Sequence, residues 1–250
     1  MSDVQAYLRA VAAADRHLHA TGPFDVFIDP VSDHPYLNYA IPRDGAEPTP
    51  GSITELVTVM GRAARTPRLE FLPAAAPAAE AALLEFGFTE QLRTPVMVRT
   101  AEDDGADAPI AADVLVQQLG PDAEREQIAG FMRTRAEAFG EPYEPGRNDG
   151  AAATFTRRIA VVAYAEEEVV GGGMCLEALE GVVELVGIGV AEAFRRRGIG
   201  SAVTSELARL AFASGVEVAF LTPGDRDTQR VYERAGFSVS DEMLHLVFEQ

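Results

Sequence analysis

The stretch Phe194-Arg195-Arg196-Arg197-Gly198-Ile199-Gly200-Ser201 decides the expected fold, because it joins a strand pattern to a helix pattern. The apolar run 182–190 before it is typical of a buried strand, and the run 201–213 after it has helical periodicity. The first turn of a helix has backbone N–H groups without intrahelical partners and lies at the positive end of the helix dipole. Arginines beside such a turn add charge-assisted hydrogen bonds. The stretch therefore predicts a cradle for a phosphate compound.

Two other nucleotide-binding patterns fail at this turn. A P-loop requires a lysine after its second glycine, and the chain contains no lysine. A dinucleotide fingerprint would require glycine or alanine at Val203 and an acid after the next strand, where Thr222 and Pro223 stand. The pattern that remains is R-x-x-G-x-G over residues 195–200.

Composition limits the classes of protein that the chain can represent. Its 250 residues are 47% hydrophobic, enough for one large or two ordinary folded domains. A formal charge of -18 argues against nucleic acid and anionic membranes as partners, and it suits a cationic or neutral partner or simply serves solubility. No signal-peptide or membrane-spanning pattern is found, so we expect a cytoplasmic protein. The single cysteine, Cys175, is expected to be a buried core thiol.

An acidic segment of small residues at 100–109 reads as a linker between residues 1–99 and 110–250. Residues 3–19 are expected to form a helix, and residues 1–23 correspond to no strand of the second half. In the second half we expect a helix capped by Asp122 and ending at Phe139, between a strand and an antiparallel three-stranded meander. The expected strands are 112–119, 158–165, 169–179, 182–190, 216–221 and a final pair within 237–248, with helices at 201–214 and 227–235.

An internal repeat is detected when the first half is shifted by 149 residues without a gap. Residues 69–72 then fall on 218–221, and residues 85–88 fall on 234–237. The first copy lacks the residues of chemical interest: Ala46, Thr49, Ala76 and Leu83 stand where the second has Arg195, Gly198, Asp225 and Tyr232. Only Gly51, the counterpart of Gly200, is retained.

Two motifs in order resemble the GNAT superfamily of acyl-CoA-dependent N-acyltransferases. The first is R-x-x-G-x-G at 195–200. The second has the family form N-x-x-A-x-x-L-Y-x-x-x-G-F and corresponds to residues 225–237, with departures at Asp225 and Thr228. The resemblance covers residues 112–250 well and 24–99 only as a faded copy. It implies an α/β (α+β) fold: a mixed, mainly antiparallel sheet flanked by helices, in two tandem copies of which the first is incomplete.

The resemblance also implies a binding site for acetyl-CoA in the second copy. In the family, the strand before the cradle splays from its neighbour and offers backbone groups to pantetheine, and the turn holds the pyrophosphate. Asp225 replaces a frequent asparagine and can accept but not donate hydrogen bonds. The expected cofactor-binding residues are Ile188, Gly189, Val190, Arg195, Arg196, Arg197, Gly198, Ile199, Gly200, Ser201 and Asp225.

Catalysis of acyl transfer to an amine requires proton transfers, because an amine with a pKa near ~10.4 is protonated at neutral pH. Glu184 occupies the position of the general-base glutamate in some family members, with a chain of water molecules as the alternative base. Tyr232 occupies the family's tyrosine position and is expected to protonate the departing thiolate. The backbone N–H of Val190 would stabilise the oxyanion.

The sequence thus predicts an enzyme that moves an acetyl group to a primary amine of a small molecule or peptide by direct attack in a ternary complex. A noncatalytic acyl-CoA-binding sensor and a structural domain with a dead cradle are the alternatives. Homodimerisation stays open. No metal is expected, since His17, His19, His34 and His245 show no ligand spacing and the first two would point apart on a helix.

Overall fold

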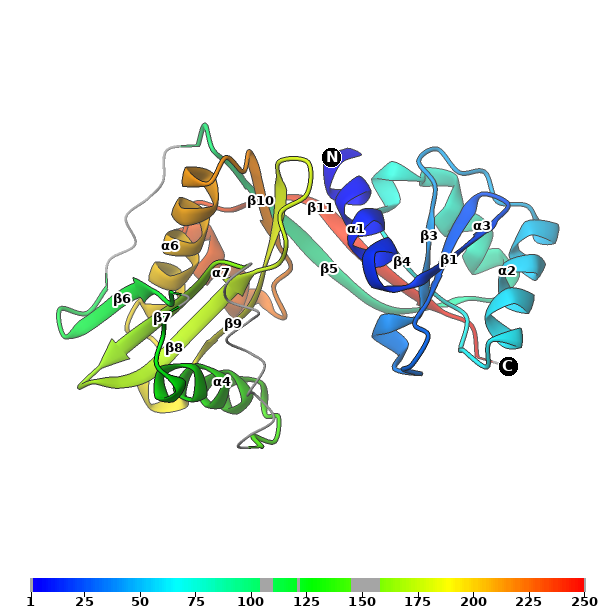
Figure 1. The fold of residues 1–250 in the computed structure, drawn as a ribbon. Helices are drawn as coiled ribbons and strands as arrows, with labels where there is room; N and C mark the ends of the chain where they lie inside the picture. The colour runs from blue at the N-terminus through cyan, green and yellow to red at the C-terminus, as the bar shows by residue number, and fades with distance from the viewer. Residues whose placement is uncertain (1, 104–109, 121, 145–157, 250) are drawn as a thin grey trace. The chain divides into compact units, whose positions relative to one another are not determined.

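The computed structural model of the chain describes residues 2–103, 110–120, 122–144 and 158–249 (Figure 1). It divides into two compact units. Unit 1 comprises the described residues of 1–96 and 240–250, and unit 2 comprises those of 97–239. This division differs from the expected one because residues 240–250 group with the first unit and residues 97–99 with the second. Most of the expected linker, residues 104–109, lies outside the described residues.

Unit 1 is an α/β unit whose strands follow the order β1-β2-β3-β4-β11, antiparallel except for β3 and β4. Short 3-10 turns at Pro35–Leu37 and Pro73–Ala75 connect some of its elements. The elements are α1 (Ser2–Asp15), β1 (His17–Thr21), β2 (Phe24–Ile28), β3 (Tyr39–Pro42), α2 (Pro50–Arg62), β4 (Arg68–Phe71), α3 (Pro77–Phe86), β5 (Thr89–Thr100) and β11 (Ser238–Val247).

The beginning of the chain departs from the expectation of one helix over residues 3–19. Helix α1 ends at Asp15, and β1 pairs with β2 through a tight turn at Gly22, whose φ of 55° favours glycine. The prediction of a helix that continues to residue 19 is therefore wrong. His17 and His19 lie two apart on a strand and share a face, whereas the helix expectation pointed them apart.

Unit 2 holds a sheet in the order β5-β10-β9-β8-β7-β6, antiparallel except for β9 and β10. The expectation of a mixed, mainly antiparallel sheet flanked by helices is confirmed. Only the end of β5 belongs to this unit. The other elements are β6 (Val114–Gln118), α4 (Arg125–Phe139), β7 (Ala160–Ala165), β8 (Glu168–Cys175), β9 (Val182–Val190), a 3-10 turn (Glu192–Phe194), α6 (Ile199–Ala213), β10 (Val218–Leu221) and α7 (Arg226–Arg234).

The turns of the meander follow from local conformation. Glu166 and Glu167 join β7 to β8 with φ of 52° and 69°, the left-handed pair that matches the twist of a two-residue hairpin. Two other expectations in unit 2 are wrong. Helix α4 is capped at Glu124, whose N–H donates to the side chain of Gln127 at 2.9 Å, instead of at Asp122. The expected pair of final strands is the single strand β11.

Helices cover both faces of the sheet in unit 2 (Figure 1), and three consecutive glycines of β8 allow their close approach. A Cβ atom at Gly172 would lie 2.7 Å from the ring of Phe131 on α4. A Cβ at Gly171 would lie 2.9 Å from Ile199, and one at Gly173 would lie 3.0 Å from Leu207, both on α6. Because alternate residues of a strand face opposite sides, α4 and α6 press on β8 from opposite faces.

Corresponding helices and strands of the two units begin at a constant spacing. Helices α2 and α6 begin at residues 50 and 199, α3 and α7 at 77 and 226, and β5 and β11 at 89 and 238. Each pair of starting positions is 149 residues apart, the offset at which the sequence repeat was detected. The repeated segments thus take the same order of secondary structure.

Candidate active site

Strand β9 is longer than the parallel partner on its far edge. The pairing of β9 with β10 covers Val182 to Glu184 on β9 and Val218 to Phe220 on β10, and β10 ends at Leu221. Strand β9 continues to Val190 alongside β8. Helices α6 and α7 begin after the carboxyl ends of β9 and β10, respectively. The carboxyl ends of parallel strands are where α/β folds bind ligands.

A bulge at Gly187 changes the direction of side chains in β9. The register with β8 shifts between Gly172 and Met174, and Gly187 has a φ of 62°. Beyond the bulge, a Cβ added at Gly189 would lie 2.6 Å from the Cβ of Ala138 on α4. The side chain of Ile188 lies on the α6 side instead, where its Cγ1 would be 2.8 Å from a Cβ at Gly173. The bulge therefore brings backbone, and not side chains, against α4 where the chain nears the turn.

Backbone groups at the end of β9 alternate between the two edges of the strand. The N–H of Ala191 donates to the carbonyl of Val170 on β8 at 2.9 Å. Successive residues of a strand direct their backbone groups to opposite edges, so Val190 presents its N–H and carbonyl away from β8. The carbonyl of Val190 accepts a hydrogen bond from Nε of Arg195 at 3.2 Å. The N–H of Val190 thus points to the edge on which β9 extends past β10.

The glycine turn begins α6 without a capping side chain. Gly198 is the N-cap residue, with a φ of 81°, and Arg196 also has a positive φ, of 63°. The first intrahelical bond runs from the N–H of Ala202 to the carbonyl of Gly198 at 3.0 Å. The N–H groups of Ile199, Gly200 and Ser201 precede that bond and form the donor end of the helix. This geometry suits an anion.

The second glycine of the turn has a different purpose from the expected one. A Cβ at Gly200 would lie 3.1 Å from Cγ1 of Val231 on α7, so glycine here lets the two helices pack closely. The hydroxyl of Ser201 donates to the carbonyl of Val231 at 3.1 Å, and Ser201 is buried. Ile199 is a core residue. Of these three residues, only the backbone is placed to bind a ligand.

The three arginines of the turn have three different environments. Arg197 pairs with Asp113, at 2.5 Å from Nη2 to Oδ2, and lies over the ring of Phe194. The hydrogen bond from Arg197 lowers the pKa of Asp113. Arg195, which binds the carbonyl of Val190, and Arg196 are both exposed. Arg195 and Arg196 therefore have guanidinium groups on the surface of the turn, while Arg197 is paired with Asp113, the residue before β6.

Tyr232 and Asp225 belong to α7. Asp225 is the N-cap residue, and its carboxylate accepts from the N–H of Thr228 at 2.7 Å, which lowers the pKa of that carboxyl. Tyr232 is 6% exposed and packs in the core cluster on the α6 side of the sheet. Burial, followed by the charge of Asp225, raises the pKa of Tyr232 to about 12. The phenol is therefore fully protonated at neutral pH.

Glu184 faces the other side of the sheet from Tyr232. Its neighbours Val183 and Leu185 belong to the core cluster that contains Tyr232, and side chains alternate along the strand. Val186, two residues on, packs in the cluster on the α4 side. Glu184 is half-buried, and its carbonyl accepts from the N–H of Leu176 at 2.8 Å. The two expected catalytic side chains thus approach β9 from opposite faces.

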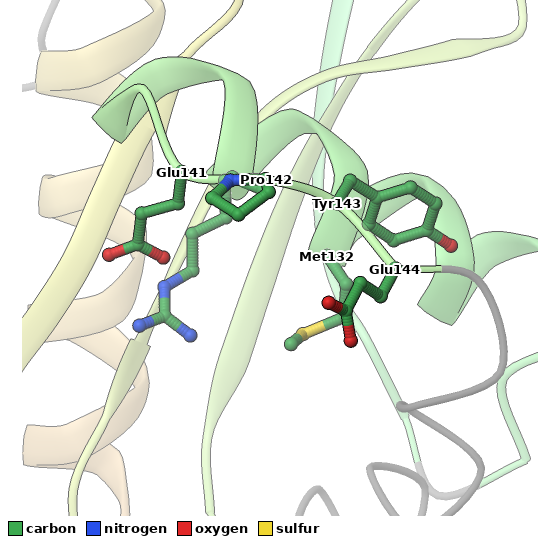
Figure 2. Close-up of a pocket in the computed structure, with 7 residues that line it drawn as sticks. Met132, Glu141, Pro142, Tyr143 and Glu144 are labelled. Atoms are coloured by element: carbon green, nitrogen blue, oxygen red, sulfur yellow. The ribbon is translucent and has the colours of Figure 1, made fainter.

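A cavity of about 370 Å³ lies on the α4 side of unit 2. Its walls come from the last turns of α4 and the segment that follows the helix, and Figure 2 shows Glu141, Glu144 and Met132 projecting in a common direction. The lining residues are Met132, Arg135, Ala136, Glu141, Pro142, Tyr143 and Glu144.

Sequence reasoning missed several residues that shape this region. An isolated glycine in a strand pattern indicates a bulge, so the bulge at Gly187 could have been predicted. The close packing of helices on residues 171–173 could also have been predicted, since glycine inside a strand marks a close approach of another segment. The position of Arg135 could not have been predicted, because only the packing of α4 on β9 brings this residue to the bulge.

Comparison with known proteins identifies the class of unit 2. Residues 126–237 match the sequence model of the family described as "Acetyltransferase (GNAT) family". No match was found among curated proteins. The family match lies within unit 2 and confirms the resemblance that was drawn from the two motifs, and members of that family use acetyl-CoA.

Several solved structures share the fold of this chain. The chain is similar to a GCN5-related N-acetyltransferase from Kribbella flavida, with a TM-score of 0.80 and 22% identity over 99% of this chain and 95% of that one. A GCN5-related N-acetyltransferase from Sphaerobacter thermophilus gives a TM-score of 0.67 and 17% identity over 90% and 75%. A tandem GNAT protein from the clavulanic acid biosynthesis pathway gives 0.59 and 11% over 90% and 77%.

Across the part of the chain that the structure describes, every helix is too short or too polar to cross a membrane.

Proposed function

We propose that unit 2 transfers an acetyl group from acetyl-CoA to a primary amine by direct attack within a ternary complex. One observation carries the proposal: α6 begins at a turn without a capping side chain, directly after a strand that extends past its parallel partner. The pyrophosphate would lie against the N–H groups of 199–201, with Arg195 and Arg196 beside it. The pantetheine arm would lie along Ile188 to Val190, at the edge of β9 that is not paired with β10.

The reaction forms one bond and breaks another. The lone pair of the amine attacks the thioester carbonyl, whose oxygen becomes anionic and accepts a hydrogen bond from the N–H of Val190. The tetrahedral intermediate then collapses, the carbon–sulfur bond breaks, and coenzyme A leaves as a thiolate. The amine loses protons to a base, for which Glu184 is the candidate, and the thiolate gains one from Tyr232.

The placement of Glu184 and Tyr232 on opposite faces of the sheet suits this order of events. An acceptor that reaches the end of β9 from the α4 side would meet Glu184, and the departing sulfur would meet the phenol on the α6 side. Tyr232 is a weaker acid than an ordinary phenol, with a pKa of about 12 against ~8.5 for a thiol. A thiolate that leaves into the same buried environment would have its own pKa raised, which narrows the mismatch.

The test uses the full chain with acetyl-CoA and a panel of amines, with release of free thiol as the readout. We expect release that depends on the acceptor, and a loss of roughly 10² to 10⁴ in turnover for Tyr232→Phe with acetyl-CoA affinity unchanged. Tyr164→Phe is the matched control, since it removes a phenol that accepts from Gln127 elsewhere in unit 2.

Acetyl-CoA binding without release for any acceptor would overturn the enzyme proposal and favour a sensor. Glu184→Gln separates the two candidate bases. If Glu184 is the base, the variant loses turnover by roughly 10² to 10⁴ while its affinity for acetyl-CoA is unchanged. If water takes the proton, turnover stays near that of the wild type.

A further inference from the structure

Arg135 on α4 is an arginine whose charge the described part of the chain does not pair. Its Nε atom is buried and has no hydrogen-bond partner among the described residues. A Cβ at Gly187 would lie 2.9 Å from that nitrogen, so the guanidinium rests on the bare backbone of the bulge. A buried donor without an acceptor is costly, typically by roughly 1–3 kcal/mol. Such a group calls for an explanation, and a bound ligand, ion or water is one.

Arg135 also lines the cavity at the end of α4, together with two carboxylates. Glu141 and Glu144 come from the segment after the helix and project to one side of it (Figure 2). The cavity thus has one cation and two anions around an apolar wall that includes Met132. These charges can pair with both ends of a zwitterion, Arg135 with a carboxylate and the glutamates with an ammonium group.

We propose that the acceptor is a short zwitterion, an amine that also carries a carboxylate, and that Arg135 binds this carboxylate. The proposal rests on the acetyl transfer proposed above. A planar guanidinium matches a carboxylate in geometry, and Glu141 and Glu144 favour the ammonium form as it enters the cavity. Arg135 is thereby a residue that determines specificity, and it takes no part in the proton transfers.

The position of Arg135 limits the length of the acceptor. The guanidinium lies over Gly187, and the oxyanion donor is the N–H of Val190, three residues later on the same strand. Three residues of extended chain span at most about 10 Å, and the bulge shortens that distance. A carboxylate on Arg135 and an amine at the thioester carbonyl must fit within this span. A free amino acid or a similarly short compound fits, and a long polyamine does not.

The experiment compares acceptors in matched pairs: α-, β- and γ-amino acids, each beside its carboxamide, with thiol release measured as kcat/KM. The variants are Arg135→Gln and Arg135→Lys, with Arg133→Gln as the control, since Arg133 is an exposed arginine on the same helix. We expect the wild type to prefer one free acid over its amide by about 10- to 100-fold. Arg135→Gln should abolish this preference, Arg135→Lys should retain part of it, and Arg133→Gln should keep it.

The possible results separate the two proposals. If the wild type acetylates amides and acids equally well, the zwitterion inference is overturned and acetyl transfer stands. If Arg135→Gln slows acids and amides by the same factor, Arg135 only supports the packing of α4, and the inference fails. If no acceptor releases thiol although acetyl-CoA binds, the proposed function fails first. Acetyl-CoA titration and circular dichroism of each variant establish that it is folded. If Arg135→Gln does not fold, Arg135→Lys provides the comparison with the wild type.

Discussion

The contact between Gly189 and Ala138 gives a sharp prediction, because one pair of atoms carries it. A methyl group at Gly189 would lie 2.6 Å from the Cβ of Ala138, and its next neighbour would be Cε2 of Phe139 at 3.6 Å. Carbon atoms pack best at about 3.5–4.0 Å, so β9 and α4 would have to separate by roughly 1 Å. Overpacking of this kind costs about 1–3 kcal/mol. We therefore expect Gly189→Ala to destabilise unit 2 by that amount.

Removing the other methyl group should relieve the clash. Ala138→Gly alone should cost at most about 1 kcal/mol, the helix penalty of glycine near the end of α4. The double variant should be no less stable than Ala138→Gly, which gives a coupling of about 1–3 kcal/mol between the two sites.

The assay is urea denaturation followed by far-ultraviolet circular dichroism, since the chain lacks tryptophan. Two compact units can give two transitions, and the one stabilised by acetyl-CoA identifies unit 2. Additive effects of the two substitutions, within about 0.5 kcal/mol, would refute the steric account.

Three further predictions concern stability and reactivity. Burial raises the pKa of Tyr232 from 10.0 to about 12. The stability that the neutral phenol contributes is therefore fully present below pH 10 and is lost as the pH rises toward 12. Between pH 9 and pH 11 this group accounts for about 1.4 kcal/mol of lost stability, which Tyr232→Phe should remove when the two are compared by urea denaturation. Burial also raises the pKa of Cys175 to about 12, so the native thiol should not react with a disulfide reagent at pH 8; fast labelling without unfolding would contradict this. A Cβ at Gly61 in α2 would meet no atom within 4 Å, so Gly61→Ala should stabilise the protein by about 0.5–1 kcal/mol and raise its thermal midpoint. A lower midpoint would contradict this prediction.

Local patterns predicted much of unit 2. The bounds of β9 were predicted in full, because an unbroken apolar run between two turn signals is short enough for one strand. The turn at 195–200 and the position of Tyr232 on a helix also followed from their neighbours in sequence.

The failures concern contacts between distant residues. The pairing of Arg197 with Asp113 and the packing of Gly200 against Val231 join segments that are far apart in the chain. Strand β1 was missed because its stability comes from pairing with β2, while its short sequence has helical neighbours. The position of Arg135 on the bulge depends on how α4 packs on β9, which no spacing in the sequence encodes.

The pairing of β4 with β11 has a consequence for the synthesis of the chain. Residues 244–247 complete the sheet of unit 1, whose other strands lie within the first hundred residues. A ribosome therefore releases the last strand of the first unit only after all of unit 2 has been made. Unit 2 can close while unit 1 waits with an open edge at β4, and such edges expose backbone groups to other chains. Loss of the final ten residues should thus damage the half of the protein that is made first.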